Sequence, residues 1–336
     1  PSFLGTHKMN YFLGVDIGNS KSHALLADEN GRCLGFGQAG PGSWEAIGWA
    51  AAQDVLHDIV GQALAQAGVA RTAVVGAGFG YAGYDWPEDR PGHVGLIDSL
   101  GLVNARYALG NDTLVGLVAG ARDGWGVVVV AGTSNNCLGR DCQGREGRVT
   151  GAGPWLGEYG GAAEIVARAV QAVAAEWTQR GPVTALSQLF LERTGAANLE
   201  DLLAGLVRQR YQLPAAAAPL VFAAAAQGDA VASEIICWAG QELGSLAVGV
   251  IRQLNLATEV FDVVLSGSLY KGGELLIAPM RQTIQAVAPG AALVRLAVPP
   301  VVGGVLLGME QVGVGTAVYR QPLLESARAF MVANRL

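Results

Sequence analysis

The sequence predicts an α/β protein built from two similar lobes, with extra helices in the second lobe. An apolar strand, a turn of small polar residues, a return strand and a hairpin open the chain near residue 11, and the same order recurs from residue 125. Segments with apolar residues at helical spacing follow each copy. The chain has 336 residues, of which 51% are hydrophobic and 15% charged, so it can bury two cores of ordinary size.

The first lobe is expected over residues 9–120. Helical spacing of apolar residues predicts helices over residues 44–67 and 112–121. Short apolar runs bounded by turn residues predict its strands, at residues 11–16, 22–28, 33–38, 71–78 and 105–109.

The second lobe is expected over residues 121–313, with a helical insertion at residues 182–256. The proline- and glycine-rich residues 299–304 should break the chain before an apolar segment. A final helix within residues 314–336 is expected to pack back on the first lobe. The same patterns predict the remaining strands at residues 125–131, 137–139, 261–265 and 291–296, and helices at residues 162–177 and 274–286.

Composition argues against several classes of protein. The net charge is −6 and no basic stripe is present, so nucleic-acid binding is not expected. The four cysteines form no C-x-x-C pair, which favours reduced thiols. The longest apolar run, residues 213–226, is interrupted by Pro214 and Pro219, so no membrane span is expected. The opening residues lack the apolar core of a signal peptide, and we expect a cytoplasmic protein.

The first strand ends in an acidic residue and a turn of small polar residues. Asp16 ends the strand, and Gly18, Ser20 and Lys21 form the turn. A carboxylate in this position can lie near a metal ion, and the N–H groups and hydroxyls of such a turn can bind phosphate oxygens. An ordinary β-turn is the alternative, and the spacing of a Walker A loop is absent.

A second turn of this kind begins with Gly132 and Thr133, after the apolar residues 127–131. It too has an ordinary turn as its alternative. Because the two turns occupy equivalent places in the repeat, together they predict a nucleotide whose phosphates are held between the lobes.

Asp112 stands between a predicted strand and a predicted helix. One interpretation is an N-cap, a position at which Asp is favoured. The other is a general base that takes the proton of an attacking hydroxyl. The sequence alone leaves both open.

Two glycine-containing segments follow strands. Gly267 and Ser268 could let an adenine ring lie against the backbone, or could simply lead into the next helix. Residues 78–83 match G-x-G-x-x-G, the pattern of dinucleotide-binding domains. Such a loop should open a helix, whereas Pro87 and a charged cluster follow here, so that alternative is disfavoured.

In their order and spacing these residues resemble the BadF/BadG/BcrA/BcrD ATPase family, most of all its N-acetylglucosamine kinase branch. The resemblance covers residues 10–313 and is most specific over residues 111–163, which hold the Asp112 helix, the second turn and a glycine-rich helix entry. It implies two ribonuclease-H-like lobes of the actin-like ATPase fold, with a nucleotide cleft between them, and ATP and Mg²⁺ as cofactors.

The resemblance also implies roles for single residues. Asp16 would be linked to the magnesium ion, and Asp112 would be the catalytic base. The expected nucleotide contacts are Gly18, Ser20, Lys21, Ser22, Gly132, Thr133, Gly267 and Ser268, and the expected sugar contacts are Trp44, Gly83, Asp112 and Glu158.

Three departures from the kinase pattern affect the acceptor site. Gly-Thr-Gly-Ser-Asn-Cys becomes GTSNNC at residues 132–137, and Gly-Asp-Glu-Gly-Ser becomes GEYGG at residues 157–161. An Asn that usually precedes the Trp44 position is replaced by Gly42 and Ser43. The cysteines that hold an iron–sulfur cluster in the activator branch have no counterpart, so that branch is disfavoured.

The expected activity is ATP-dependent phosphorylation of the 6-hydroxyl of an amino sugar, preferably N-acetylglucosamine. A glucosamine or other hexose kinase is one alternative. A sugar-responsive ATPase or regulator with little transfer activity is the other, and it would not need Asp112 as a base. The sequence leaves the oligomeric state open, a homodimer included.

Overall fold

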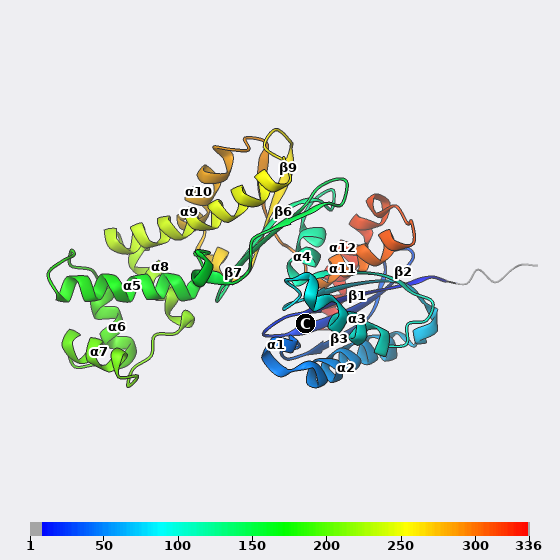
Figure 1. Ribbon diagram of the computed structural model, residues 1–336, viewed down its shortest axis with the longest axis horizontal. Helices are drawn as coiled ribbons and strands as arrows, with labels where there is room; N and C mark the ends of the chain where they lie inside the picture. Colours follow the sequence, from blue (N-terminus) through cyan, green and yellow to red (C-terminus); the bar gives the residue numbers. More distant parts are fainter. Residues whose placement is uncertain (1–8, 335–336) are drawn as a thin grey trace, which may run out of the picture. The chain divides into compact units, whose positions relative to one another are not determined.

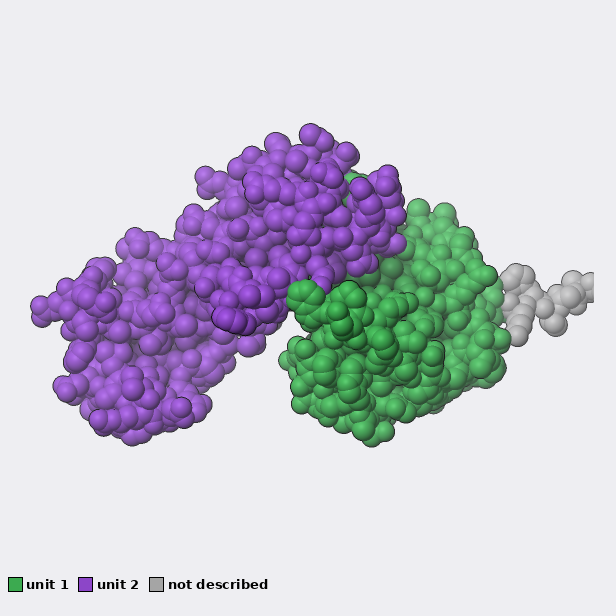
Figure 2. All heavy atoms as spheres, in the orientation of Figure 1, with its two compact units in different colours: residues 1–126, 294–336 green, residues 127–293 purple. Residues whose placement is uncertain are grey.

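The structure is a computed structural model that describes residues 9–334, and these fall into two compact units (Figure 2). Unit 1 combines the chain up to residue 126 with residues 294–336, and unit 2 is formed by residues 127–293. Residues 1–8, which the sequence predicts not to form a signal peptide, lie outside the described residues.

Unit 1 contains a five-stranded sheet in the order β3-β2-β1-β4-β5 (Figure 1). The central strand β1 (Tyr11–Ile17) pairs antiparallel with β2 (Ser22–Asp28) and parallel with β4 (Val74–Tyr81). β3 (Cys33–Ala39) pairs with β2, and β5 (Arg106–Asn111) runs parallel to β4. The parallel neighbours β1, β4 and β5, and also β3, therefore have their carboxyl ends at one edge of the sheet.

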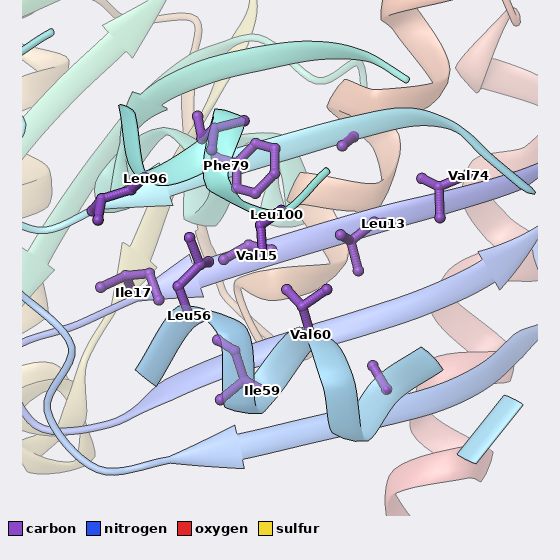
Figure 3. Packing of buried hydrophobic residues seen from close by; sticks show 14 of the residues in the cluster. Leu13, Val15, Ile17, Leu56, Ile59, Val60, Val74, Phe79, Leu96 and Leu100 are labelled. Carbon is purple, nitrogen blue, oxygen red and sulfur yellow. The ribbon is translucent and has the colours of Figure 1, made fainter. Parts of the chain in front are cut away.

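One face of this sheet packs on α2 (Trp49–Ala67) through a wholly buried apolar cluster. Figure 3 shows Val15 of β1 near Leu56 of α2, and Leu13 of β1 near Val60 of α2. The long helix expected over residues 44–67 is wrong in one respect. Gly48, with φ +80°, separates a short helix α1 (Trp44–Ile47) from α2.

The opposite face of the sheet packs on α11 (Val301–Gln311), because alternate strand residues point to opposite faces. A Cβ on Gly304 would lie 2.8 Å from the Cα of Gly14, and one on Gly308 would lie 2.9 Å from the Cα of Ala77. The glycines that were expected to break the chain instead let a helix lie directly on the sheet. That helix begins at residue 301, with Pro300 as its N-cap, where no donor is lost.

The last helix, α12 (Thr316–Ala333), also packs within unit 1. The Arg320 guanidinium donates to the Val118 carbonyl of α4 (Asp112–Gly120) at 2.6 Å, and the Cys33 N–H donates to the Ser326 hydroxyl at 2.9 Å.

The compact units differ from the expected lobes, because the segment 294–313 belongs to unit 1. The packing of α11 on β1 and β4 is the reason. A further helix, α3 (Arg90–Ser99), follows the charged cluster after Pro87 and was not expected from the sequence.

Unit 2 repeats the topology of unit 1. Its sheet has the order β10-β9-β6-β7-β8, which is the order of the first sheet when the strands are matched along the chain. The prediction of two similar α/β lobes is thus confirmed. The strands are β6 (Gly126–Ala131), β7 (Asn135–Arg140), β8 (Glu146–Arg148), β9 (Phe261–Ser266) and β10 (Ala291–Arg295).

Helices make up the rest of unit 2, and most of them lie between β8 and β9 (Figure 1). Within the described chain, α9 (Ala230–Gln253) alone is long and apolar enough to cross a membrane. Of its most apolar 18-residue stretch, 61% is buried inside the fold, as in a core helix. The helices are α5 (Ala162–Trp177), α6 (Leu186–Thr194), α7 (Leu199–Val207), α8 (Ala218–Ala226), α9 (Ala230–Gln253) and α10 (Glu274–Gln285).

Candidate functional site

In unit 1 the expected site residues lie at the carboxyl edge of the three parallel strands. The register pairs Ile17 of β1 with Tyr81 of β4, and Tyr81 with Asn111 of β5. Asp16 and Asp112 therefore stand at the same edge, although 96 residues separate them in the sequence. Ligands of open α/β sheets commonly bind at this edge.

The first predicted phosphate-binding turn, residues 18–21 (the first phosphate turn below), lies at the same edge. The Gly18 N–H donates to the Lys21 carbonyl at 3.1 Å, which closes the turn. Ser20 and Lys21 are exposed and can reach a ligand. Ser22, in contrast, is fully buried in β2, so its hydroxyl does not face solvent.

Trp44 and Gly83, both expected to contact the sugar, are brought together by the fold. The Trp44 indole N–H donates to the Gly83 carbonyl at 2.8 Å. The indole ring also stacks on Trp49, with ring centroids 4.6 Å apart and an interplanar angle of 7°. Gly83 has φ +81°, which favours glycine at this position. Trp44 thus has a packing role that holds the loop around Gly83.

Asp112 is the first residue of α4, and it is not the N-cap. Asn111 occupies the cap, where its side-chain oxygen accepts from the Thr113 N–H at 2.9 Å. The interpretation of Asp112 as a helix cap is therefore wrong. Its carboxyl group remains available at the carboxyl edge of β5.

The pKa of Asp112 is raised to about 7, mainly by burial and to a smaller extent by the neighbouring negative charges of Asp16 and Asp85. Hydrogen bonds from Thr113 act in the opposite direction. A carboxyl group with this pKa is suited to general-base catalysis near neutral pH.

Asp85 belongs to this site, and the sequence reasoning missed it. Its carboxylate accepts a hydrogen bond of 2.9 Å from the Asn111 side-chain amide, which ties the loop after β4 to the start of α4. The only signal in the sequence was the charged cluster around Pro87, which had been used to argue against a dinucleotide-binding loop. Gly78 and Gly80 of that motif lie inside β4, and no helix opens there.

Asp16 is mostly buried, with 15% of its side chain exposed, and its carboxylate lies 3.9 Å from the Nδ1 of His23. No cluster of three or more His, Cys, Asp or Glu side chains in the described chain could hold a metal ion alone. One carboxylate beside a phosphate turn fits Mg²⁺ that arrives with nucleotide phosphates, because Mg²⁺ is often bound by one or two carboxylates and the substrate phosphates.

In unit 2 the second phosphate turn is bound to the start of α5. The carbonyls of Gly132 and Thr133 accept from the N–H groups of Ala162 and Ala163, at 2.9 and 3.0 Å. The hydroxyl-bearing Thr133 is exposed. The turn is thereby fixed beside a helix N-terminus, where an anion is favoured.

A cavity of about 460 Å³ adjoins this turn and lies wholly within unit 2. Gly267, with φ +112°, packs against Ala131 at the end of β6 and brings Ser268 to the cavity. The alanine-rich wall was missed, because residues 182–256 were interpreted only as a helical layer. The lining residues are Gly132, Thr133, Ala162, Ala215, Ala216, Ala218, Pro219, Phe222, Ser268, Leu269, Lys271 and Gly272.

Glu158, expected to contact the sugar, is buried and already has protein partners. Its carboxylate accepts from the Thr150 N–H and hydroxyl, at 2.6 and 2.8 Å, and from the Gly153 N–H at 3.2 Å. These bonds close the loop that precedes α5. The neighbouring Tyr159 packs near Trp238, with ring centroids 5.9 Å apart.

Two sugar kinases are similar to this chain over most of its length. An N-acetyl-D-glucosamine kinase of Dictyostelium discoideum is 27% identical over 311 residues, 89% of this chain and 98% of that protein. An N-acetylmuramic acid/N-acetylglucosamine kinase of Clostridium acetobutylicum is 24% identical over 305 residues, 90% of this chain and 99% of that protein.

Among solved structures, a protein of Chromobacterium violaceum provisionally described as an N-acetylglucosamine kinase superposes with a TM-score of 0.64 and 21% identity. The superposition covers 89% of this chain and 99% of that one, and it shows a shared fold. Residues 13–308 match the family model described as the BadF/BadG/BcrA/BcrD ATPase family. That match spans most of the chain and all of the described site, and the protein therefore belongs to the BadF/BadG/BcrA/BcrD ATPase family.

Proposed function

We propose that this protein transfers the γ-phosphoryl group of ATP to a hydroxyl of a small sugar. The observation that carries the proposal is Asp112, a carboxyl group with a pKa near 7 at the carboxyl edge of β5. A protein that only binds a sugar has no need of such a base. The nucleotide would occupy the cavity in unit 2, with its phosphates at Gly132 and Thr133.

In this reaction Asp112 accepts the proton of the attacking hydroxyl, which raises the nucleophilicity of its oxygen. The hydroxyls of Ser20 and Thr133 and the ammonium group of Lys21 would donate to phosphate oxygens, whereas the Gly18 N–H closes its own turn. Mg²⁺, bound next to Asp16 when the nucleotide is present, would neutralise phosphate charge. Transfer further requires that water be excluded while the acceptor and the γ-phosphate meet.

We further propose that the acceptor is an amino sugar, preferably N-acetylglucosamine, phosphorylated at its 6-hydroxyl. The names of the two kinase relatives support this choice. Trp44 and the loop at Gly83 would form one wall of the acceptor site, since both lie at the edge that holds Asp112. Glu158 would act indirectly, by holding the loop that precedes α5 through its buried carboxylate. Because ATP is the donor, we place the reaction in the cytoplasm.

The test is an ADP-release assay with a panel of N-acetylglucosamine, N-acetylmuramic acid, glucosamine and glucose, and a control without acceptor. We expect the fastest turnover with N-acetylglucosamine, and NMR of the product should show phosphate on O6. Preference for glucosamine or glucose would replace the acetyl-specific proposal. ADP release that is independent of any sugar would favour the regulator instead.

Asp112→Asn serves as the matched variant in this assay, because it keeps the shape of the side chain and cannot accept the proton. We expect kcat to fall by about 10²–10⁴. The dissociation constant for ADP should stay the same. Near-normal turnover of Asp112→Asn would remove the base from the proposal.

A further inference from the structure

The cavity in unit 2 offers a base-binding site with few groups that can read the edge of a base. Its walls come from the 3₁₀ turn at Ala215–Ala217, from α8 and from the 3₁₀ turn at Ser268–Gly272. No lining side chain in the described chain is an amide, a carboxylate or an imidazole. These are the side chains that accept from, or pair in two places with, a purine edge.

Three polar side chains remain, and none of them selects adenine. Thr133 lies on the phosphate turn. The Ser268 hydroxyl can rotate to donate or accept, so it suits either kind of base edge. Lys271 can only donate. Adenine presents a donor at position 6, whereas guanine and hypoxanthine present an acceptor there, so a lysine donor cannot favour adenine at that position.

Backbone groups of two lining residues are used within the protein. The Gly132 N–H donates to the Ser134 carbonyl at 2.9 Å, and the Ala162 N–H donates to the Gly132 carbonyl at 2.9 Å. These groups are therefore committed to the turn and to its junction with α5. What the lining side chains offer a base is mainly apolar surface.

Phe222 supplies the aromatic part of that surface. It is half-buried, and its ring lies against Gly272, where a Cβ would come within 2.6 Å of the ring carbon Cδ1. The ring is therefore fixed in place by the turn. Every purine has a π-face that can stack on such a ring, so the contact does not depend on the identity of the base.

We propose that the cavity binds purine nucleotides with little regard to the base, so that guanine and hypoxanthine nucleotides replace adenine nucleotides. This inference rests on the proposed function, since it assigns the cavity to the nucleotide. A site built to pair a polar group can reject analogues by factors of about 10⁴–10⁵, whereas an apolar site discriminates by roughly 10–200-fold. The lining places this cavity in the second class.

The test is calorimetric titration of the full-length protein with ADP, GDP, IDP and CDP in the presence of Mg²⁺. We expect the dissociation constants for GDP and IDP to lie within about 200-fold of that for ADP, the limit of an apolar site, and weaker binding of CDP, whose single ring stacks on less surface. Discrimination by more than about 200-fold against either GDP or IDP would overturn the inference. Failure of all four to bind would overturn both the inference and the proposed function.

Two variants locate the effect in the cavity. Phe222→Ala should weaken the binding of ADP, GDP and IDP by a similar factor, on the order of tenfold. Phe330→Ala, on α12 of unit 1, is its control and should change none of them. Lys271→Met should weaken the binding of GDP and IDP more than that of ADP. Its control, Arg193→Met on α6, should leave the relative affinities unchanged.

If Phe330→Ala weakened the binding of all the nucleotides, or Phe222→Ala weakened none, the base would not lie on Phe222. An unchanged ratio of GDP to ADP affinity in Lys271→Met would remove Lys271 from base recognition. Thermal midpoints of all variants identify any that fail to fold, and the wild-type titration decides the inference without them.

Discussion

Asp112 has an ionisation that opposes stability and favours reactivity. Burial and the charges of Asp16 and Asp85 raise its pKa to about 7 in the folded protein. In the unfolded chain the group has an ordinary pKa near 4. Between these values the folded state binds more protons than the unfolded state, so the free energy of unfolding should fall as pH rises from about 4 to 7.

Asp112→Asn removes the loss of stability that accompanies ionisation of Asp112, because the amide never ionises. We expect its thermal midpoint to exceed that of the wild type at pH 8, and the difference to shrink toward pH 5. Each kcal/mol corresponds to a shift of roughly 2–4 °C in a domain of this size. Scanning calorimetry without ligands measures it, and equal midpoints at pH 8 would contradict the raised pKa.

Asp85→Asn should lower the pKa of Asp112, since it removes one of two neighbouring negative charges and still accepts from Asn111. The acid limb of kcat/KM for the sugar should therefore move to lower pH, with the plateau kept within about tenfold. A pH–rate profile measures it. Asp54→Asn, on α2, is a charge-matched control, and an unmoved limb in Asp85→Asn would show that Asp85 only holds the loop.

At the scale of elements, two departures from the kinase pattern touch each other. The family pattern has Gly in place of Ser134 and Ser in place of Gly161. In this protein a Cβ on Gly161 would lie 2.9 Å from the Cα of Ser134, at the point where the second phosphate turn meets α5. The two exchanged positions are therefore neighbours, which the sequence could not show because the residues are 27 positions apart.

Gly161→Ser should push the phosphate turn away from α5, at a cost of about 1–3 kcal/mol for an overpacked site. We expect a lower thermal midpoint and a higher KM for ATP. Adding Ser134→Gly should restore part of both, because a glycine gives the backbone of the turn more freedom to move away from the new side chain. A double-mutant cycle gives the coupling energy. Gly249→Ser is the control, because nothing lies within 4 Å of its Cβ position. Additive effects in the cycle would show that the two positions are not coupled.

The sequence predicted the secondary structure correctly where the spacing of apolar residues and the flanking turn residues indicated the same element, as at β2 and α5. It failed where a distant partner decided the outcome. The start of α11 looked like a chain break, because Gly303 and Gly304 usually interrupt helices. They are helical here since β1 and β4 offer glycines and a flat surface to pack against. The Ala-rich wall of the cavity escaped notice for a similar reason, as no local pattern marks an apolar base site.

At the scale of the whole molecule, the internal repeat predicted both sheets, while the division of the chain depended on packing. The order of strands in unit 2 follows from the repeat, but the return of residues 294–336 to unit 1 depends on contacts of α11 and α12. Of the candidate site, the sequence predicted the two turns, Asp16 and Asp112. It did not point to Asp85 or Phe222, because their places in the candidate site depend on neighbours far along the chain.

The proposed nucleotide cavity and the two acidic residues Asp16 and Asp112 lie in different units, the cavity in unit 2 and the carboxyl groups in unit 1. Asp16→Ala should therefore separate binding from transfer. We expect kcat/KM for Mg·ATP to fall by at least 10²-fold, because a group that holds the metal supplies several kcal/mol to the transition state.

The affinity of the same variant for ADP without Mg²⁺ should stay within about twofold of the wild type, since the cavity in unit 2 is untouched. Calorimetric titrations with and without Mg²⁺ measure it beside the assay of turnover. His23→Gln is the control for the neighbouring position, as His23 lies 3.9 Å from the Asp16 carboxylate and is not expected to bind the metal. Equal losses of metal-free ADP binding and of turnover in Asp16→Ala would mean that Asp16 supports the fold of the protein rather than the metal.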